Sequence, residues 1–274
     1  MRKIGWKNDG KWHFYFSDCV LHEECVQIEG EESAFSLGFT EHILEGENGR
    51  KTDLLQLIGV LQKAPEILYP IFISNISALL YPIWEHEEQG SVLWLCGESG
   101  SGKTELAMTL GTYVDREKRR SQSKSLFSAN AKTRNMIQTF RLHRGINFVL
   151  DDVKKERVPG QKNKLSDNVD TVIRSVFAQR LTDNYALADY EQDDAIRAGA
   201  IITGEIIDIQ ESTKARILFL PVADFINTQE GSAAISSLQR HPEWLVGTMA
   251  GIIQYLCHEW NADGGTKRYM DSFE

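Results

Sequence analysis

SVLWLCGESGSGKT, residues 91–104, is the stretch that decides the fold. Its first half is an almost wholly apolar run ended by glycine, which is typical of a strand buried on both faces of a parallel sheet. Its last eight residues match G-x-x-x-x-G-K-[ST], in which glycines let backbone N–H groups surround phosphate oxygens and a helix begins at the lysine. The sequence therefore predicts a strand, a phosphate-binding loop and a helix in succession.

The chemistry of this pattern assigns a role to most of its residues. Lys103 is expected to reach the β- and γ-phosphates of a nucleotide as a catalytic group, and the Thr104 hydroxyl is expected to ligate Mg²⁺. ATP and Mg²⁺ are thus the expected cofactors. The alternative is an ordinary glycine-rich turn with an exposed lysine. The predicted nucleotide-binding residues are Gly97, Glu98, Ser99, Gly100, Ser101, Gly102, Lys103, Thr104 and Glu105.

A second apolar run ends in two carboxylates. FVLDD at 148–152 has the form of a Walker B strand, which is a run of apolar residues followed by an acid. Asp151 is expected to hold Mg²⁺, directly or through water, and Asp152 to polarise the attacking water. Many ATPases carry glutamate at the second position, so the shorter aspartate leaves open that Asp152 only caps the following turn.

Strands and helices alternate from residue 91 onward, which predicts a five-stranded, mainly parallel α/β sheet of the P-loop NTPase kind, similar to AAA+ and RecA folds. The segment 124–129 lies between the two motifs and indicates the ATPase class with an extra central strand. Thr203 ends the next strand, where that class places a residue that senses the γ-phosphate; the alternative is a turn residue. The expected strands are 91–97, 124–129, 146–152, 198–204 and 216–222, of which 91–97, 198–204 and 216–222 are expected to be buried. The expected helices are 104–114, 131–143 and 166–179, the last capped by Ser166.

A basic residue just before the last strand is a candidate arginine finger. Ring-forming ATPases often supply such an arginine to the neighbouring subunit, where it stabilises charge on the transferred phosphoryl group. Arg216 is the first candidate, followed by Lys214 and Arg197. A surface ion pair is the alternative role for Arg216.

Two clusters of basic residues interrupt an acidic chain. One comprises Arg116, Lys118, Arg119, Arg120 and Lys124, and the other comprises Lys154, Lys155, Arg157, Lys162 and Lys164. The second cluster follows the acidic strand end, where DNA-translocating ring ATPases often project a loop into the central pore. Its cations are suited to gripping backbone phosphate without reading sequence. The alternative is a solvated loop.

The regions on either side of the ATPase core have a predictable type of secondary structure. Residues 1–50 indicate a small β-rich segment, 51–90 a helical region, 91–235 the ATPase core, and 236–274 a C-terminal helical region. The uncharged stretch 67–84 favours a buried helix over a membrane span, and Pro65, Pro70 and Pro82 are expected to break the helices there.

Composition narrows the class of protein. The 274 residues carry 42% apolar and 25% charged residues with a formal charge of −9, which excludes disordered and uniformly basic chains. Four cysteines make no disulfide framework, and no secretory signal begins the chain, so a cytoplasmic location is expected.

GESGSGKT, FVLDD, TGE (203–205) and ESTKARI (211–217) together resemble a family of helicase-type P-loop ATPase modules of unknown function. These modules occur in primase–helicase and replication proteins of phages, plasmids and integrative elements, and they resemble superfamily 3 and AAA+ ATPases. The likeness covers roughly residues 55–260. It implies an ATP-driven motor on single-stranded or forked DNA, forming an oligomeric ring such as a hexamer. The chain lacks a primase-like segment, so it is expected to act alone or with a primase on another polypeptide, or to be a fragment of a longer protein, and no membrane is involved.

Two other readings stay open. One is a regulatory or protein-remodelling ATPase. The other is a small-molecule kinase, for which REKRR at 116–120 would form a lid over the nucleotide. Stimulation of ATP turnover by single-stranded DNA distinguishes the motor from both.

Overall fold

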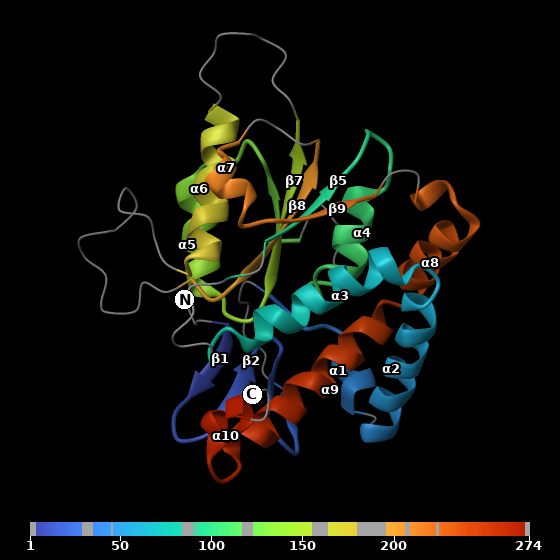
Figure 1. Cartoon of the computed structure of the whole chain (residues 1–274). Coiled ribbons are helices and arrows are strands. Elements are labelled where there is room, and N and C mark those ends of the chain that lie inside the picture. The colour runs from blue at the N-terminus through green and yellow to red at the C-terminus, as the bar shows by residue number, and fades with distance from the viewer. Residues whose placement is uncertain are drawn as a thin grey trace, which may run out of the picture.

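The structure is a computed structural model of the whole chain, and it describes residues 4–28, 35–44, 46–83, 90, 92–116, 123–154, 164–179, 196–205, 209–222 and 225–271. Its described part contains two β-sheets and the helices packed around them (Figure 1). The larger sheet leads into the glycine-rich loop and is the centre of the fold.

Five parallel strands form the larger sheet in the spatial order β6-β7-β8-β5-β9. The position of β8 between β5 and β7 confirms the predicted α/β class with an extra central strand. Because parallel strands end at the same edge of a sheet, the polar ends of these three strands are neighbours. The strands are β5 (Val92–Cys96), β6 (Leu126–Ser128), β7 (Asn147–Val153), β8 (Gly199–Gly204) and β9 (Leu218–Pro221).

Burial follows the apolar runs in the central strands but not at the sheet edge. Every residue of β5 and β8 is buried, as is the first half of β7. The expectation that residues 216–222 form another buried strand is wrong, because Leu218 in β9 is 60% exposed. β9 is the last strand of the sheet and pairs with β5 on one side, and no strand in the described part of the chain pairs with its other side.

Helices cover both faces of this sheet. Figure 1 shows α5 (Thr133–Leu142) and α6 (Lys164–Phe177) on one face, and α3 (Pro65–Leu80) and α4 (Lys103–Leu110) on the other. α4 ends at Leu110, four residues earlier than expected, and Gly111 follows as its C-cap with its N–H donating to Ala107 O. α6 begins before Ser166, so the expected helix cap at Ser166 is wrong.

The apolar stretch at 67–84 forms most of α3, which packs against α4, β7 and β8. Pro65 begins this helix, whereas Pro70 lies inside it and does not break it, contrary to expectation. Proline lacks one N–H donor, and the helix tolerates that loss in its second turn. Among the described residues, no helix is both long enough and apolar enough to cross a membrane.

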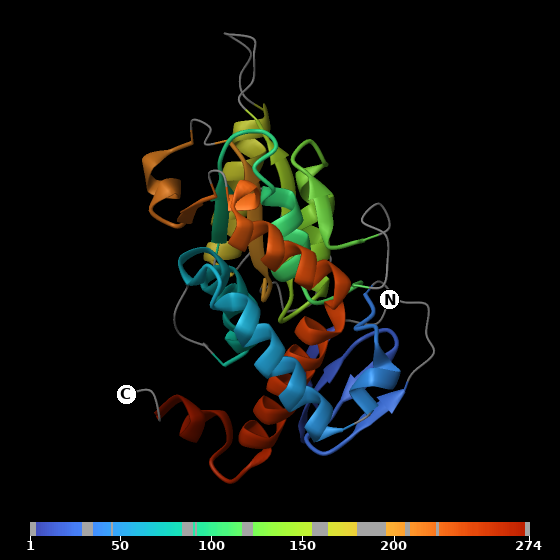
Figure 2. The same ribbon diagram turned by 90° about the vertical axis from the view of Figure 1, so that its right-hand side faces the viewer.

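A second helical layer joins distant parts of the chain. Figure 2 shows α2 (Glu47–Leu61) running beside α9 (Pro242–Asn261), and the two helices pack closely. α8 (Gln229–Arg240) follows the short 3₁₀ helix η3 (Phe225–Asn227) and contacts α4. The remaining helices are α1 (Thr40–Leu44), α7 (Glu211–Lys214) and α10 (Gly265–Asp271).

The smaller sheet is antiparallel and lies at the amino-terminal end of the chain. Its strands β1 (Gly5–Asn8), β2 (Trp12–Tyr15), β3 (Cys19–Leu21) and β4 (Val26–Ile28) pair in chain order. Trp260 of α9 packs against Trp6 and Trp12, with ring centroids 4.4 and 5.2 Å apart. This contact ties the sheet to the last long helix. The division of the chain into four regions by residue number stays a prediction.

Candidate functional site

The loop between β5 and α4, residues 97–102, is named the glycine loop below. It turns the chain sharply because Gly100 and Gly102 adopt φ angles of +87° and +78°, which side-chain-bearing residues rarely adopt. Gly102 is also the residue directly before α4, so the first amides of that helix face the loop opening. Helix N-termini of this kind favour anions.

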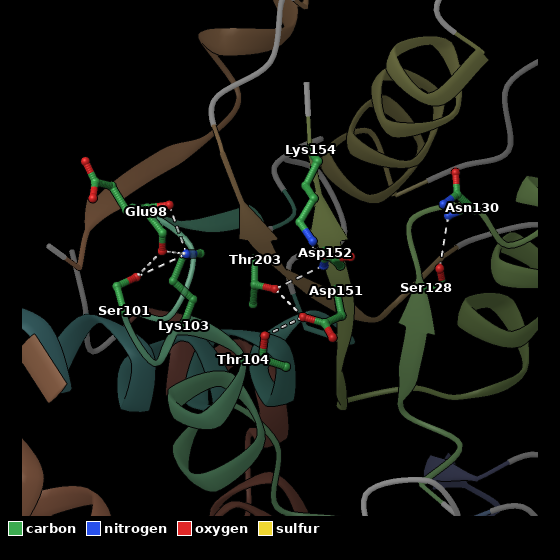
Figure 3. A network of polar contacts seen from close by, with 11 residues as sticks. Glu98, Ser101, Lys103, Thr104, Ser128, Asn130, Asp151, Asp152, Lys154 and Thr203 are labelled. Carbon is green, nitrogen blue, oxygen red and sulfur yellow. Dashed lines mark hydrogen bonds and ion pairs between the residues drawn. The ribbon is translucent and has the colours of Figure 1, made fainter. Parts of the chain in front are cut away.

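Lys103 lies across the mouth of the glycine loop and is 9% exposed. Its Nζ donates to Gly97 O at 2.9 Å and to Ser101 Oγ at 3.0 Å, and it also donates to Glu98 O (Figure 3). Burial lowers the pKa of Lys103, and the nearby Glu205 carboxylate opposes that shift first among the neighbouring groups. The ammonium group is thus held by neutral oxygens, which phosphate oxygens can replace with a gain in charge pairing.

Asp151 accepts hydrogen bonds from hydroxyl groups on two other elements. Its Oδ1 accepts hydrogen bonds from Thr104 Oγ1 at 2.5 Å and from Thr203 Oγ1 at 2.6 Å. Figure 3 shows the three side chains converging from α4, β7 and β8. A carboxylate beside a hydroxyl is an oxygen donor set that suits Mg²⁺, which completes its shell with water and substrate phosphates.

The described residues contain no group of three or more His, Cys, Asp or Glu side chains that could hold a metal ion. A site built from Thr104 and Asp151 needs no such group, because Mg²⁺ usually takes one or two protein ligands and draws the rest from phosphates and water. The residues present therefore fit the expected ion.

An extra residue in β7 turns Asp152 outward. Leu150 pairs with Ile202 and Val153 pairs with Gly204, so three steps along β7 match two along β8. This β-bulge is accompanied by a φ angle of +66° at Asp152. The Asp152 side chain is 60% exposed as a result, and its Oδ1 lies 2.7 Å from Lys154 Nζ. The two neighbouring aspartates therefore have different surroundings and can do different work.

Gly204 makes the bulge possible. A Cβ atom on Gly204 would lie 2.1 Å from Val153 O, and its φ angle is +154°. We expect Gly204→Ala to lower the free energy of unfolding by about 3 kcal/mol, from backbone strain plus overpacking. Gly10→Ala is the matched control, because Gly10 has φ +109° and open space around it. Equal denaturant midpoints for the two variants would contradict the role of the close approach.

One open pocket of about 270 Å³ joins these groups. It contains two lysines and three acidic residues, and its far wall is formed by the ends of β7 and β8. Its lining residues are Ser99, Gly100, Gly102, Lys103, Thr104, Glu105, Asp152, Val153, Lys154, Thr203, Gly204 and Glu205. Most of the site residues predicted from the sequence therefore line this pocket.

The candidate finger residues lie away from this pocket. Arg216 follows α7, where its guanidinium donates to Ser212 O and lies 5.3 Å from the centre of the Phe177 ring. Lys214 pairs with Glu211 at 2.6 Å. Arg197 precedes β8 and donates to Tyr81 O at 3.1 Å, at the opposite end of that strand from Thr203.

Much of the two basic clusters lies outside the described residues. Of the second cluster, the structure describes the side chain of Lys154 alone; Lys155, Arg157 and Lys162 fall in the gap, and Lys164 begins α6. Of the first cluster, Lys118, Arg119 and Arg120 fall outside.

Two contacts at the site could not be predicted from the sequence. Gln239 of α8 donates to Glu105 at 2.7 Å across 134 residues of chain. Ile226 packs where a side chain on Gly102 would lie, about 3.0 Å away. Both connect the glycine loop with the region that follows β9, and only the folded chain brings them together.

Comparison with known proteins bears on the fold. No family model matches the chain, and no curated protein matches it. A solved structure described as the active helicase Cch of SCCmec type IV superposes with a TM-score of 0.52 and 15% identity, covering 95% of this chain and 49% of that one. The JCV helicase gives a TM-score of 0.36 at 13% identity, over 81% of this chain and 68% of that one, which is too distant to support an argument.

This chain thus spans about half of the length of Cch. At this level of identity the likeness concerns the fold. Together with the strand order and the small antiparallel sheet, it establishes that the chain has an α/β, P-loop NTPase fold of the kind found in a helicase.

Proposed function

We propose that the chain binds and hydrolyses ATP with Mg²⁺ and works as the motor of a helicase-type protein. One observation carries this proposal: Lys103, Thr104 and Thr203 line one open pocket, and Asp151, from a third element, accepts hydrogen bonds from both threonines. An ordinary glycine turn with an exposed lysine accounts for neither the burial of Lys103 nor the hydroxyl pair on Asp151.

The proposed roles follow from the geometry. The glycine loop and Lys103 hold the β- and γ-phosphates, and Thr104 with Asp151 would hold Mg²⁺, which supplies charge neutralisation on the phosphate oxygens. Asp152 accepts a proton from the attacking water as the water oxygen bonds to the γ-phosphorus. The bond from that phosphorus to the bridging oxygen breaks, and its electron pair leaves with ADP. Asp152 then gives its proton to the phosphate product, which restores the site.

Thr203 is proposed to sense the γ-phosphate. Its hydroxyl donates to Asp151, and it also lies 3.4 Å from the Asp152 backbone N–H, which donates to it. A ligand that changes the Asp151 contact therefore also changes the support of Asp152. Glu205, at the same strand end, lines the pocket on its outer side.

The proposed partner is DNA, in single-stranded or forked form, inside a homo-oligomeric ring such as a hexamer. The basic segment 154–164 supports this, because it carries five cations against one acid and begins at the pocket edge. The structural neighbour Cch is described as an active helicase. A role in the DNA replication of a phage or other mobile element, beside a separate primase, completes the proposal and rests on the sequence resemblance.

Among the residues that the structure describes, no specific contact supports either alternative function. A kinase lid would place arginines over the nucleotide, but Arg116 is turned inward and donates to Met108 O. Burial lowers the pKa of Arg116 to about 10. The other arginines of that segment lie outside the described residues. A protein-remodelling ATPase would share the same pocket and differ in its partner.

Measured ATP turnover with and without single-stranded DNA tests the proposal. We expect hydrolysis that rises with DNA and falls by about 10³-fold in Asp152→Asn, because an amide cannot accept the proton from water. Nucleotide binding by calorimetry should be unchanged in that variant. Turnover by Asp152→Asn at the wild-type rate would remove Asp152 from the mechanism, and equal rates with and without DNA would favour the remodelling alternative.

A further inference from the structure

Lys154 faces the site from its outer rim. Its Nζ lies 2.7 Å from Asp152 Oδ1, and both side chains line the pocket, with exposed fractions of 55% and 60%. The hydrogen bond from Lys154 to Asp152 raises the pKa of the lysine, so the ammonium stays charged. Figure 3 shows Lys154 reaching toward Asp152 from beyond the strand end. The carboxylate proposed as the proton acceptor is therefore already held by a cation.

The backbone explains why these two residues meet. The bulge turns Asp152 out of β7, and Lys154 follows at the first position beyond the strand. In a regular strand, residues two apart would share one face with their side chains parallel. Here Asp152 has a φ angle of +66°, and its carboxylate lies against the ammonium group of Lys154.

We propose that Lys154 is a positioning residue that holds Asp152 in the ion pair, and that a nucleic-acid phosphate takes Lys154 away from Asp152 and so frees the carboxylate for hydrolysis. The inference rests on the proposed function and adds to it the means by which DNA raises the rate. In the ion pair the Asp152 carboxylate is aimed at the ammonium instead of at water. Exchange of partners frees the carboxylate to face water.

The ion pair has the properties that such an exchange requires. Exposed ion pairs are weak, because water screens them and two long side chains must be held in one geometry. A polyanion offers many phosphates and releases counterions when it binds, so it competes well for a single exposed lysine. Lys154 is also the first of the five cations in 154–164, which places it where that segment meets the pocket.

No atom is added to the reaction by this exchange. The ammonium keeps its three protons and changes its acceptor from Asp152 to a phosphate oxygen of the nucleic acid. The proton of the attacking water still goes to Asp152, and the electron pair of the broken bond still leaves with ADP. Only the fraction of molecules with a free Asp152 changes.

The test compares Lys154→Met with Lys154→Arg and with the matched control Lys63→Met. Lys63 is an exposed lysine between α2 and α3 that does not line the pocket. Turnover of ATP is measured with and without single-stranded oligo(dT). We expect Lys154→Met to raise kcat without DNA by about threefold, the scale of an exposed ion pair, with KM unchanged. The fold-stimulation by DNA should fall by the same factor, and Lys154→Arg should behave as the wild type.

Each other outcome overturns the inference. A lower kcat or a higher KM in Lys154→Met would mean that the lysine contacts the nucleotide itself. A profile equal to that of Lys63→Met, in a wild type that hydrolyses ATP and responds to DNA, would refute the role of Lys154 and leave the proposed function standing. A wild type that neither binds nor hydrolyses ATP would refute both. Equal melting temperatures of the variants exclude a merely structural effect.

Discussion

Replacing Lys103 by alanine is expected to lower ATP turnover by about 10³-fold, the scale seen when a preorganised donor to a transition-state charge is removed. The affinity for ATP should also fall by about 30-fold, because a charge-assisted hydrogen bond is lost. In the structure the ammonium group is held by Gly97 O and Ser101 Oγ at the loop mouth. Phosphate oxygens would take the place of these neutral acceptors. Calorimetric titration with ATP and steady-state turnover measure the two effects.

The variant needs a control for folding. Lys103 forms hydrogen bonds with residues of the glycine loop, Gly97 and Ser101 among them, so Lys103→Ala could also loosen that loop. Lys103→Arg keeps the charge but replaces a compact ammonium with a planar fork, and we expect it to lose turnover while keeping most of the affinity. Lys132→Ala, an exposed lysine outside the pocket, should leave both quantities unchanged. Undiminished binding and hydrolysis by Lys103→Ala would refute the phosphate-binding role of the loop.

Local chemistry explains why much of this site could be predicted from the sequence. The apolar runs that end at Cys96, Leu150 and Ile202 each stop at a polar or glycine residue, and parallel pairing then brings those ends to one edge. The convergence of Thr104, Asp151 and Thr203 follows from that rule. The distances between these side chains could not be predicted from that rule.

Other features depend on partners far away in the chain. The bulge at Asp152 arises from the register between β7 and β8 and from the close approach at Gly204, and no local pattern indicates it. The exposure of Leu218 depends on β9 being an edge strand, which an apolar run cannot reveal. The ion pair of Lys154 with Asp152 forms beside this bulge, and no local pattern indicates it.

The polar residues inside the apolar stretch 67–84 also have partners that the sequence does not predict. In the sequence, Ser74 and Asn75 argue against a membrane span. In the structure both are buried, and Asn147 at the start of β7 donates to Ser74 Oγ at 3.0 Å and to Asn75 Oδ1 at 3.2 Å. They fasten α3 to the strand that carries the two aspartates. The sequence reveals that the polar groups need partners, but only the fold supplies Asn147.

Arg216→Ala is expected to leave ATP binding unchanged and to lower turnover by about 10³-fold, the lower end of the effect of an arginine finger. Arg216 does not line the pocket of its own chain, so its effect should come from a neighbouring subunit. It lies next to the exposed edge strand β9, with its guanidinium over the Phe177 ring. Arg268→Ala, which removes an exposed arginine from α10, is the control and should turn over ATP normally.

Mixing variants separates a finger supplied by a neighbour from a residue that acts within one chain. Arg216→Ala keeps an intact glycine loop, and Lys103→Ala keeps an intact arginine. In a mixed ring, an Arg216→Ala subunit beside a Lys103→Ala subunit regains a complete site, because the loop of one faces the arginine of the other. We expect the mixture to recover part of the wild-type turnover, while native mass measurement verifies that mixed oligomers form. Mixed oligomers without recovered turnover would mean that Arg216 serves only its own chain, where its position beside Phe177 offers it a structural role instead.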